Sequence, residues 1–245
     1  MLGPQLTEYG EAAQLQERLW AECVASGGRR NFLVLVEHPP VITIGRSGSA
    51  RDVLADGARL SRLGVSVAET NRGGEVTFHG PGQLVAYPIM DLAPRGRDLH
   101  RYLRDLEAWL VRLCRSYGVP AHAESPHTGV WVEDRKIASI GIAVRRWVST
   151  HGVALNVDVD LGWFDLIVPC GLPGVRMTSL EAELGAAPPM ADVAERAADY
   201  FAEDFGLARA ARMGSAGVPA CARGRGRPRY RGDGYAAAAD TIETA

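Results

Sequence analysis

Residues 72–88 read RGGEVTFHGPGQLVAYP, and this stretch combines glycine-rich turns with two short apolar runs. Its two runs of β-branched and aromatic residues, 76–78 and 84–87, predict short strands. Its four glycines are more than one tight turn requires, and glycine lets backbone approach a ligand closely. We interpret the stretch as two strands joined by a turn that brings Arg72, His79 and Gln83 together. A plain hairpin without a functional role is the alternative.

The composition is that of an ordinary globular protein, with 47% apolar and 23% charged residues in 245. A net charge of −2 argues against a nucleic-acid partner, and no apolar run is long enough to span a membrane. No basic segment followed by an apolar segment opens the chain, so we expect a cytoplasmic protein. The four cysteines are scattered, without a CxxC or Cys/His cluster. We therefore expect no disulfide framework, no metal and no cofactor.

Apolar periodicity predicts the secondary structure. Apolar residues at three- and four-residue spacing indicate helices over residues 7–26, 98–118 and 191–205, with a shorter helix over 59–63. Further strands are predicted over residues 31–36, 41–45, 65–68, 128–132, 136–144 and 148–157, the last interrupted at His151 and Gly152. The apolar segment 163–168 is interpreted as a strand that breaks before Cys170. Because most strands follow one another across short turns, we predict an α/β (α+β) fold with a mixed, largely antiparallel sheet and packed helices.

The composition changes after Met213. Arginine alternates with glycine, alanine, proline and tyrosine, and an alanine run follows. We predict a single catalytic domain over residues 1–213 and a disordered tail over residues 214–245. An RNA-binding tail is the weaker alternative.

Cys170 and Lys136 are the candidate catalytic pair. Cys170 lies between Pro169 and Gly171 at the end of an apolar segment, outside any helical apolar face. An ammonium near a thiol lowers the thiol pKa from about 8.5, and a lysine in a dry pocket can accept and return a proton. The structural alternatives are an inert buried cysteine and a solvated lysine. A papain-like Cys–His hydrolase is a further alternative, with His79 or His151 as base and Asn156 as the orienting residue.

Several motifs together resemble the octanoyltransferase family, LipB. They are RGGEVTFHGPGQ at residues 72–83, KIASIG at 136–141, HGVALNV at 151–157, PCG at 169–171 and TSL at 178–180. Their order and separations fit, and the resemblance covers residues 6 to 210. It departs from the family pattern at Val153, where a larger apolar residue is expected, and at His127, where a Pro-Gly pair is common. The resemblance implies the catalytic-domain fold shared by biotin and lipoate protein ligases.

The resemblance also implies a reaction and its partners. The family moves an octanoyl (or lipoyl) group from octanoyl-acyl carrier protein to a lysine of the lipoyl domains of 2-oxoacid dehydrogenases and of the glycine cleavage H protein. Cys170 would form an acyl-thioester, and Lys136 would lower the thiol pKa and shuttle its proton. The implied acyl pocket consists of Arg72, Gly73, Gly74, Glu75, Val76, Thr77, Phe78, His79, Ser139, Ile140, Gly141, Gly152, Val153 and Ala154. We expect a monomer.

The residues agree with this reaction on physical grounds. Thioester exchange followed by amide formation needs no nucleotide, and the chain has no P-loop or GxGxxG motif. The small residues of the pocket motifs are interpreted as leaving space for a straight acyl chain. Arg72 and Arg145 are candidates for a basic surface that meets acidic partners. An ATP-dependent lipoate-protein ligase on the same fold and a non-catalytic carrier-docking module are the alternatives.

Overall fold

The computed structural model describes residues 6–124, 126–169 and 174–207, and its main element is a seven-stranded sheet. In spatial order its strands are β1 (Phe32–Val36), β5 (Gln83–Ile89), β9 (Val148–Asn156), β8 (Arg135–Arg145), β7 (Val130–Val132) and β6 (His122–Ala123), with β10 (Arg176–Met177) beside β8. The pairs along this order are antiparallel, and only the described pair β10–β8 is parallel. The predicted mixed, largely antiparallel sheet is confirmed.

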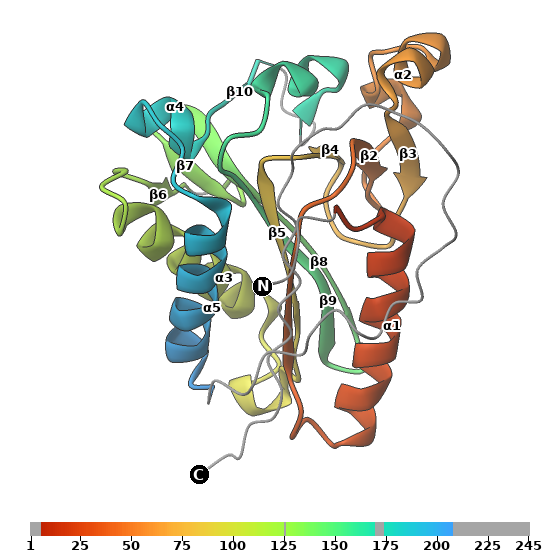
Figure 1. The fold of residues 1–245 in the computed structure, drawn as a ribbon. Coiled ribbons are helices and arrows are strands. Elements are labelled where there is room, and N and C mark those ends of the chain that lie inside the picture. The colour runs from red at the N-terminus through yellow and green to blue at the C-terminus, as the bar shows by residue number, and fades with distance from the viewer. Residues whose placement is uncertain (1–5, 125, 170–173, 208–245) are drawn as a thin grey trace.

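Helices cover both faces of this sheet (Figure 1). Helix α1 (Tyr9–Ala25) packs on one face, and helices α3 (Leu99–Arg115) and α5 (Met190–Phe205) pack on the other. Because helices cover both faces, β1 is buried along its whole length. Its successive side chains point to opposite faces of the sheet. Its Val34 and Val36 join the core under α1, whereas Leu33 and Leu35 join the core under α3 and α5. The three long helices predicted from periodicity are confirmed.

A smaller sheet lies beside one end of the main sheet, on the side of α1 (Figure 1). Its order is β3 (Ser66–Glu69), β2 (Val41–Ile44) and β4 (Val76–His79), with β3 parallel to β2. Helix α2 (Gly57–Leu63) and the 3-10 helix η3 (Leu161–Leu166) supply the rest of its core. The remaining short elements are η1 (Ala50–Asp52), η2 (Ala93–Arg95) and α4 (Leu180–Leu184).

Two local predictions are wrong. The apolar segment 163–168 is mostly 3-10 helix, because Asp160 caps the N–H of Gly162 and Phe164 turns into the core of the smaller sheet. Strand β9 is continuous through His151 and Gly152. Gly152 is required there because a Cβ atom would collide with the Ala86 carbonyl of β5, so this glycine marks close strand approach and not a break.

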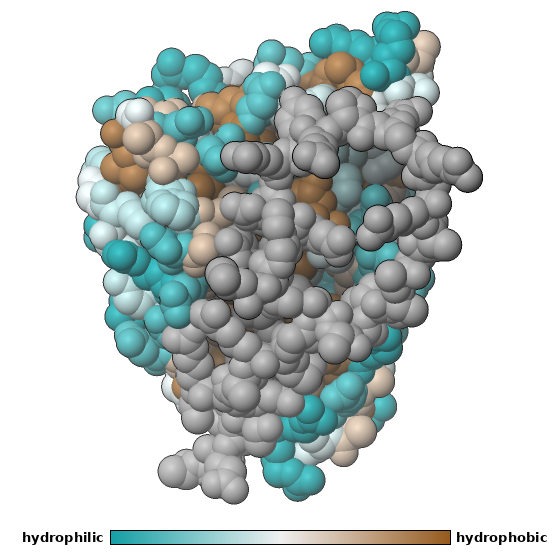
Figure 2. Space-filling model, in the orientation of Figure 1, coloured by the Kyte–Doolittle hydropathy of each residue, from teal (hydrophilic) through white to brown (hydrophobic). Residues whose placement is uncertain are grey.

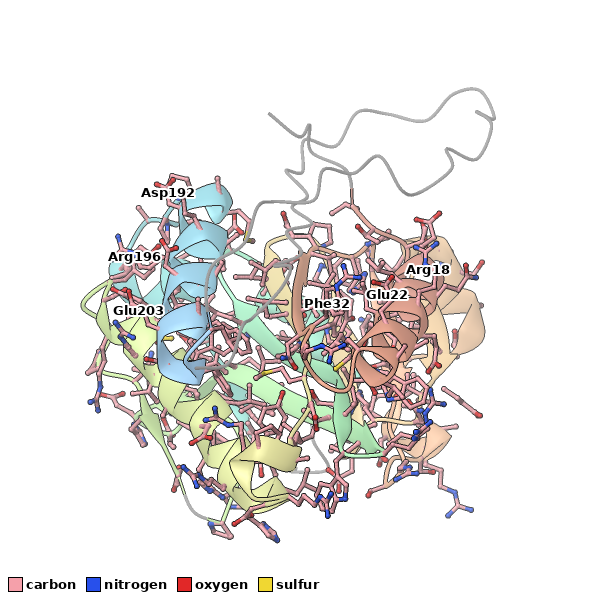
Figure 3. All side chains as sticks on the ribbon, turned by 90° about the horizontal axis from the view of Figure 1, so that it is seen from below. Arg18, Glu22, Phe32, Asp192, Arg196 and Glu203 are labelled. Atoms are coloured by element: carbon pink, nitrogen blue, oxygen red, sulfur yellow. The ribbon has the colours of Figure 1, made fainter. Side chains whose placement is uncertain are left out.

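The outer surface is mainly charged. Figure 3 shows Arg18 and Glu22 on α1 and Asp192, Arg196 and Glu203 on α5, on the two flanks of the molecule. On the face seen in Figure 2, hydrophilic residues dominate the visible margins. Among the described helices, none combines the length and the apolar character that crossing a bilayer requires. The Arg-rich tail lies outside the described residues.

Candidate active site

A cavity of about 280 Å³ lies between the smaller sheet and the α1-facing side of the main sheet. Its floor comes from β5, β8 and β9, where Ser139 pairs with Ala154 and Gly141 pairs with Gly152. Its opposite wall comes from residues 74–77 and from His79 of the smaller sheet. Tyr9 and Tyr87 line it near the histidines, and His127, Thr128 and Lys136 line it at the beginning of β8.

The structure brings most of the predicted pocket residues to this cavity. Its lining includes Arg72, Gly74, Glu75, Val76, Thr77, His79, Lys136, Ser139, Ile140, Gly141, Gly152, Val153 and Ala154. Phe78 is elsewhere: its fully buried ring stacks on Trp163 at a centroid distance of 5.3 Å in the core of the smaller sheet. Gly73 is also outside the lining, and its N–H donates to the Ile142 carbonyl at 2.7 Å. The predicted nucleophile Cys170 lies outside the described residues.

Lys136 is a buried lysine on the wall of this cavity. Its side chain is among the largest fully buried ones, with 2% of the residue exposed, so the solvated-turn alternative is excluded. Its ammonium lies 5.2 Å from the centroid of the Trp131 ring, within the range of a cation–π contact. Its backbone pairs with Met177 of β10 and accepts the N–H of Thr178 at 2.9 Å. The cavity therefore has a positive charge that the protein shields from bulk water.

Arg72 does not form the basic surface that the sequence predicted. Only 7% of the residue is exposed, and its guanidinium donates to the Thr43 carbonyl and to the Glu75 carbonyl at 2.7 and 2.8 Å. It also donates to the Thr43 hydroxyl at 2.9 Å. Through these hydrogen bonds Arg72 links the glycine-rich segment to β2. Arg145 is exposed and pairs with Glu17 at 2.8 Å.

The glycines near Arg72 have a packing role. A Cβ atom on Gly141 would lie 3.1 Å from Arg72 Cδ, and one on Gly45 would lie 2.8 Å from Arg72 Nη1. The missing side chain of Gly141 therefore makes room for the arginine, and that of Gly152 makes room for β5. Both glycines also line the cavity, and their predicted role in leaving space for an acyl chain stays a prediction. Ser139 and Ala154, which pair with each other across β8 and β9, are small side chains that line the floor of the cavity.

Three histidines cluster at the tyrosine end of the cavity and are neutral near pH 7. Burial, the neighbouring His38 ring and the Arg72 charge lower the pKa of His79 to about 3. Burial lowers the pKa of His38 to about 4, and burial with the Arg72 charge lowers that of His151 to about 4. A base is most effective when its pKa is near the working pH. These rings are therefore poor general bases at neutral pH.

Hydrogen bonds fix each of these rings. His79 Nδ1–H donates to Gln83 Oε1 at 2.7 Å, and the Gln83 amide donates to Asn156 Oδ1 at 2.9 Å. Asn156 in turn donates to the Thr178 carbonyl at 2.9 Å. The amide of Asn156 thus stabilises Gln83 and the segment before α4. It orients neither histidine directly, so the papain-like arrangement with Asn156 is not formed by the described residues. His151 Nε2–H instead donates to Asn71 Oδ1 at 2.5 Å.

Several site residues were missed by the sequence analysis. His38 accepts a hydrogen bond from the Tyr87 hydroxyl at 2.7 Å and donates to the Thr7 carbonyl at 2.6 Å. Tyr9 stacks on His79 at 6.4 Å between centroids. Tyr9 falls within the predicted helix over residues 7–26, where an aromatic residue is expected in the apolar face. His38 precedes two prolines, which was the one available indication of a fixed polar turn.

No cluster of His, Cys, Asp and Glu among the described residues could hold a metal ion. The site offers an apolar floor, one buried ammonium and neutral hydrogen-bonded rings. Such a site can hold an uncharged chain beside a group that prefers the anionic form, such as a thiolate.

Comparison with known proteins places the chain in a family. The family model of the lipoyl protein ligase A/B catalytic domain matches residues 8–202. An octanoyltransferase from Geobacter metallireducens is 50% identical over 194 residues, which are 79% of this chain and 87% of that protein. One from Citrifermentans bemidjiense is 54% identical over 177 residues, covering 72% of this chain and 82% of that protein.

Solved structures agree on the fold. A lipoate-protein ligase A bound with ATP has a TM-score of 0.65 at 18% identity, over 84% of this chain and 86% of that one. A bi-partite lipoate protein ligase from Thermoplasma acidophilum has a TM-score of 0.62 at 17% identity, over 84% and 85% of the two chains. The chain therefore belongs to the lipoyl protein ligase A/B catalytic-domain family and, within it, to the octanoyltransferase (LipB) group of acyltransferase enzymes.

Proposed function

We propose that the protein transfers an octanoyl (or lipoyl) group from acyl carrier protein to a lysine of a lipoyl domain, with Cys170 carrying the group as a thioester. The observation that carries this proposal is the buried ammonium of Lys136 on the wall of the cavity. The acceptors would be the lipoyl domains of 2-oxoacid dehydrogenases and the glycine cleavage H protein.

The chain path supports the pairing of Cys170 with Lys136. Met177 pairs with Lys136 across β10 and β8, and Cys170 precedes Met177 by seven residues. An extended chain covers at most about 3.5 Å per residue, so the Cα atom of Cys170 is tethered within roughly 25 Å of that of Met177, the partner of Lys136. Pro169, the residue before Cys170, follows Val168, whose N–H donates to the Asp52 carbonyl at 2.7 Å. Both ends of the Cys170 segment are thus anchored to described elements.

The proposed reaction has two steps. In the first, the Cys170 thiolate attacks the carbonyl carbon of the donor thioester, the new C–S bond replaces the old one, and the departing carrier thiolate takes a proton from Lys136. In the second, the amine of the acceptor lysine attacks the Cys170 thioester. The amide bond forms, the C–S bond breaks, and the amine proton passes to Lys136 as the Cys170 thiolate is released. A desolvated lysine suits both proton transfers.

The shape of the cavity also supports a short acyl chain. Its volume of about 280 Å³ is at the lower end of small-molecule sites, which run from about 300 to 1,000 Å³. Val76, Val85, Ile140 and Val153 contribute apolar lining. Each buried methylene contributes about 0.8 kcal/mol, so chain length can be sensed carbon by carbon.

Intact-protein mass spectrometry tests the proposal. The protein is mixed with octanoyl-acyl carrier protein without ATP, beside Cys170→Ala and, as a matched control, Cys23→Ala. An octanoyl adduct on the parent and on Cys23→Ala only, discharged by an unmodified lipoyl domain, supports the transferase.

Each rival gives a different result in the same experiment. Acceptor modification that requires ATP and free octanoate would indicate the ligase. Release of free octanoate without acceptor would indicate a hydrolase, and no chemistry at all would indicate a docking module. The single domain over residues 1–213, the disordered tail, the monomeric state and the cytoplasmic location stay predictions.

A further inference from the structure

Helix α3 carries a charged residue among its buried residues. Glu107 is 1% exposed and is one of the buried residues of this helix, which packs on the main sheet. A carboxylate in such a position is costly unless it is paired and hydrogen-bonded. One oxygen, Oε2, accepts a hydrogen bond from Arg104 Nη1 at 2.5 Å, and the other, Oε1, accepts the backbone N–H of Gly129 at 3.0 Å. The second contact joins α3 to the residue before β7.

Gly129 connects Glu107 with Lys136. Its φ of +136° lies in a region that is essentially restricted to glycine. A Cβ atom at this position would lie 2.6 Å from Lys136 Cε, 3.2 Å from Lys136 Nζ and 2.8 Å from the Ala138 carbonyl. The end of the lysine side chain therefore rests directly on the Gly129 backbone, and the position of that backbone limits where the ammonium can lie.

Trp131 bounds the ammonium on a second side. It is 3% exposed and pairs with Lys136 across β7 and β8, next to an irregularity in the register at Val130 and Trp131. Its ring centroid lies 5.2 Å from Lys136 Nζ. Its indole N–H is buried and has no hydrogen-bond partner in the described part of the chain. The tryptophan is thus held by packing. Its position depends on β7, which begins directly after Gly129.

We propose that Glu107 is a positioning residue for Lys136: through the Gly129 N–H it fixes the turn that holds the lysine ammonium against the Trp131 ring. This inference rests on the proposed function, in which Lys136 moves protons to and from thiolates. Displacement of a catalytic group by about 1 Å can cost around 100-fold in rate. Glu107 itself touches neither the substrate nor the thiol in this account.

The experiment compares four variants that separate positioning from stability. Glu107→Leu removes the acceptor, whereas Glu107→Gln keeps an oxygen for the Gly129 N–H. Gly129→Ala displaces the lysine directly. Leu110→Ala is the matched control, because it removes a buried side chain of the same helix face without removing the hydrogen bond to Gly129. The folded state of each variant is checked by circular dichroism and thermal unfolding.

Two readouts are measured on each full-length variant. The first is the rate of octanoyl-adduct formation on Cys170 at saturating and at limiting donor. The second is the rate at which an amine-reactive ester labels Lys136, followed by peptide mass spectrometry, and this rate does not depend on catalysis. Because Lys136 is buried, its labelling in the parent should be slow.

We expect Glu107→Leu and Gly129→Ala to slow adduct formation at saturating donor at least about tenfold and to speed Lys136 labelling about fivefold or more. Glu107→Gln should stay within about threefold of the parent in both readouts, and Leu110→Ala within about twofold, since neither loses the acceptor. A Glu107→Leu variant that behaves like Leu110→Ala in both readouts would overturn the inference. If Glu107→Leu does not fold, the same comparison is made with Glu107→Ala, which also removes the acceptor of the Gly129 N–H.

Failure of the inference is distinguishable from failure of the proposed function. An adduct on the parent with unchanged rates and labelling in the variants would remove only the positioning role of Glu107. A parent that forms no adduct would remove the transferase proposal. In that case faster Lys136 labelling in Glu107→Leu would still support the placement of the lysine by Glu107, and unchanged labelling would reject it.

Discussion

Acidification should destabilise this protein steeply, because three buried histidines are neutral in the folded state. The folded-state pKa values are about 4 for His38, about 3 for His79 and about 4 for His151, against about 6.5 in an unfolded chain. Between pH 4 and 6.5 the unfolded state binds more protons, so the free energy of unfolding falls as the pH falls. Above pH 6.5 this contribution is complete and the stability no longer depends on these rings.

The magnitude follows from linkage. At pH 5 each ring lowers the free energy of unfolding by about 2 kcal/mol relative to neutral pH, and the three together by about 6 kcal/mol. The limiting slope is about 1.4 kcal/mol per pH unit for each ring. A loss of this size is comparable to the whole stability of an ordinary domain, about 5–15 kcal/mol.

Urea unfolding followed by tryptophan fluorescence at pH 7.5, 6.0 and 5.0 measures this loss. His151→Asn is the informative variant: it removes one titrating ring, and asparagine tolerates the φ of +55° that His151 adopts. The slope of the variant between pH 6 and 5 should be about two thirds of the parent slope. A parent whose unfolding free energy changes by less than about 1 kcal/mol between pH 7.5 and 5.0 would refute the reasoning.

Three further substitutions test the packing around the cavity. Arg72→Lys should lower the free energy of unfolding by about 2–4 kcal/mol, measured in urea, because a lysine cannot reproduce the fork of bonds to Thr43; an unchanged midpoint would contradict this. Gly152→Ala should cost about 3 kcal/mol or prevent folding, since its Cβ would overlap the Ala86 carbonyl; near-parent thermal stability would show that β5 can move. Ala154→Leu should shift donor preference from octanoyl toward hexanoyl about tenfold, measured as kcat/KM for each donor; an unchanged ratio would place the acyl chain elsewhere.

Local patterns were sufficient to predict most of the elements. The amphipathic residues of α3 and α5 and the apolar run of β1 appear in the structure where periodicity placed them. Residues 163–168 were misassigned because a short apolar run has the same appearance in a strand and in a buried 3-10 turn. The division of the strands into two sheets depends on contacts between distant segments, which no local pattern contains.

The location of the cavity-lining residues could be predicted where they belong to a sequence motif. Most residues that the motifs assigned to the pocket line the cavity, and Lys136 lies there at the beginning of β8. The packing role of Gly141 could not be predicted, because the arginine beside it, Arg72, comes from a segment 69 residues away. Glu107 was missed although a charged residue on the apolar stripe of α3 was visible in the sequence. A charge at a predicted core position is the indication that could have identified it.

The most direct test of the central claim is the pH dependence of the reaction between Cys170 and iodoacetamide, in the parent and in Lys136→Met. Peptide-resolved mass spectrometry isolates Cys170, and burial raises the pKa of Cys23 to about 11 and that of Cys114 to about 12, so these thiols should stay unmodified near neutral pH. We expect an apparent Cys170 pKa below about 7.5 in the parent and one near 8.5 in the variant. Coincident profiles with a pKa near 8.5 would contradict a Cys170–Lys136 pair.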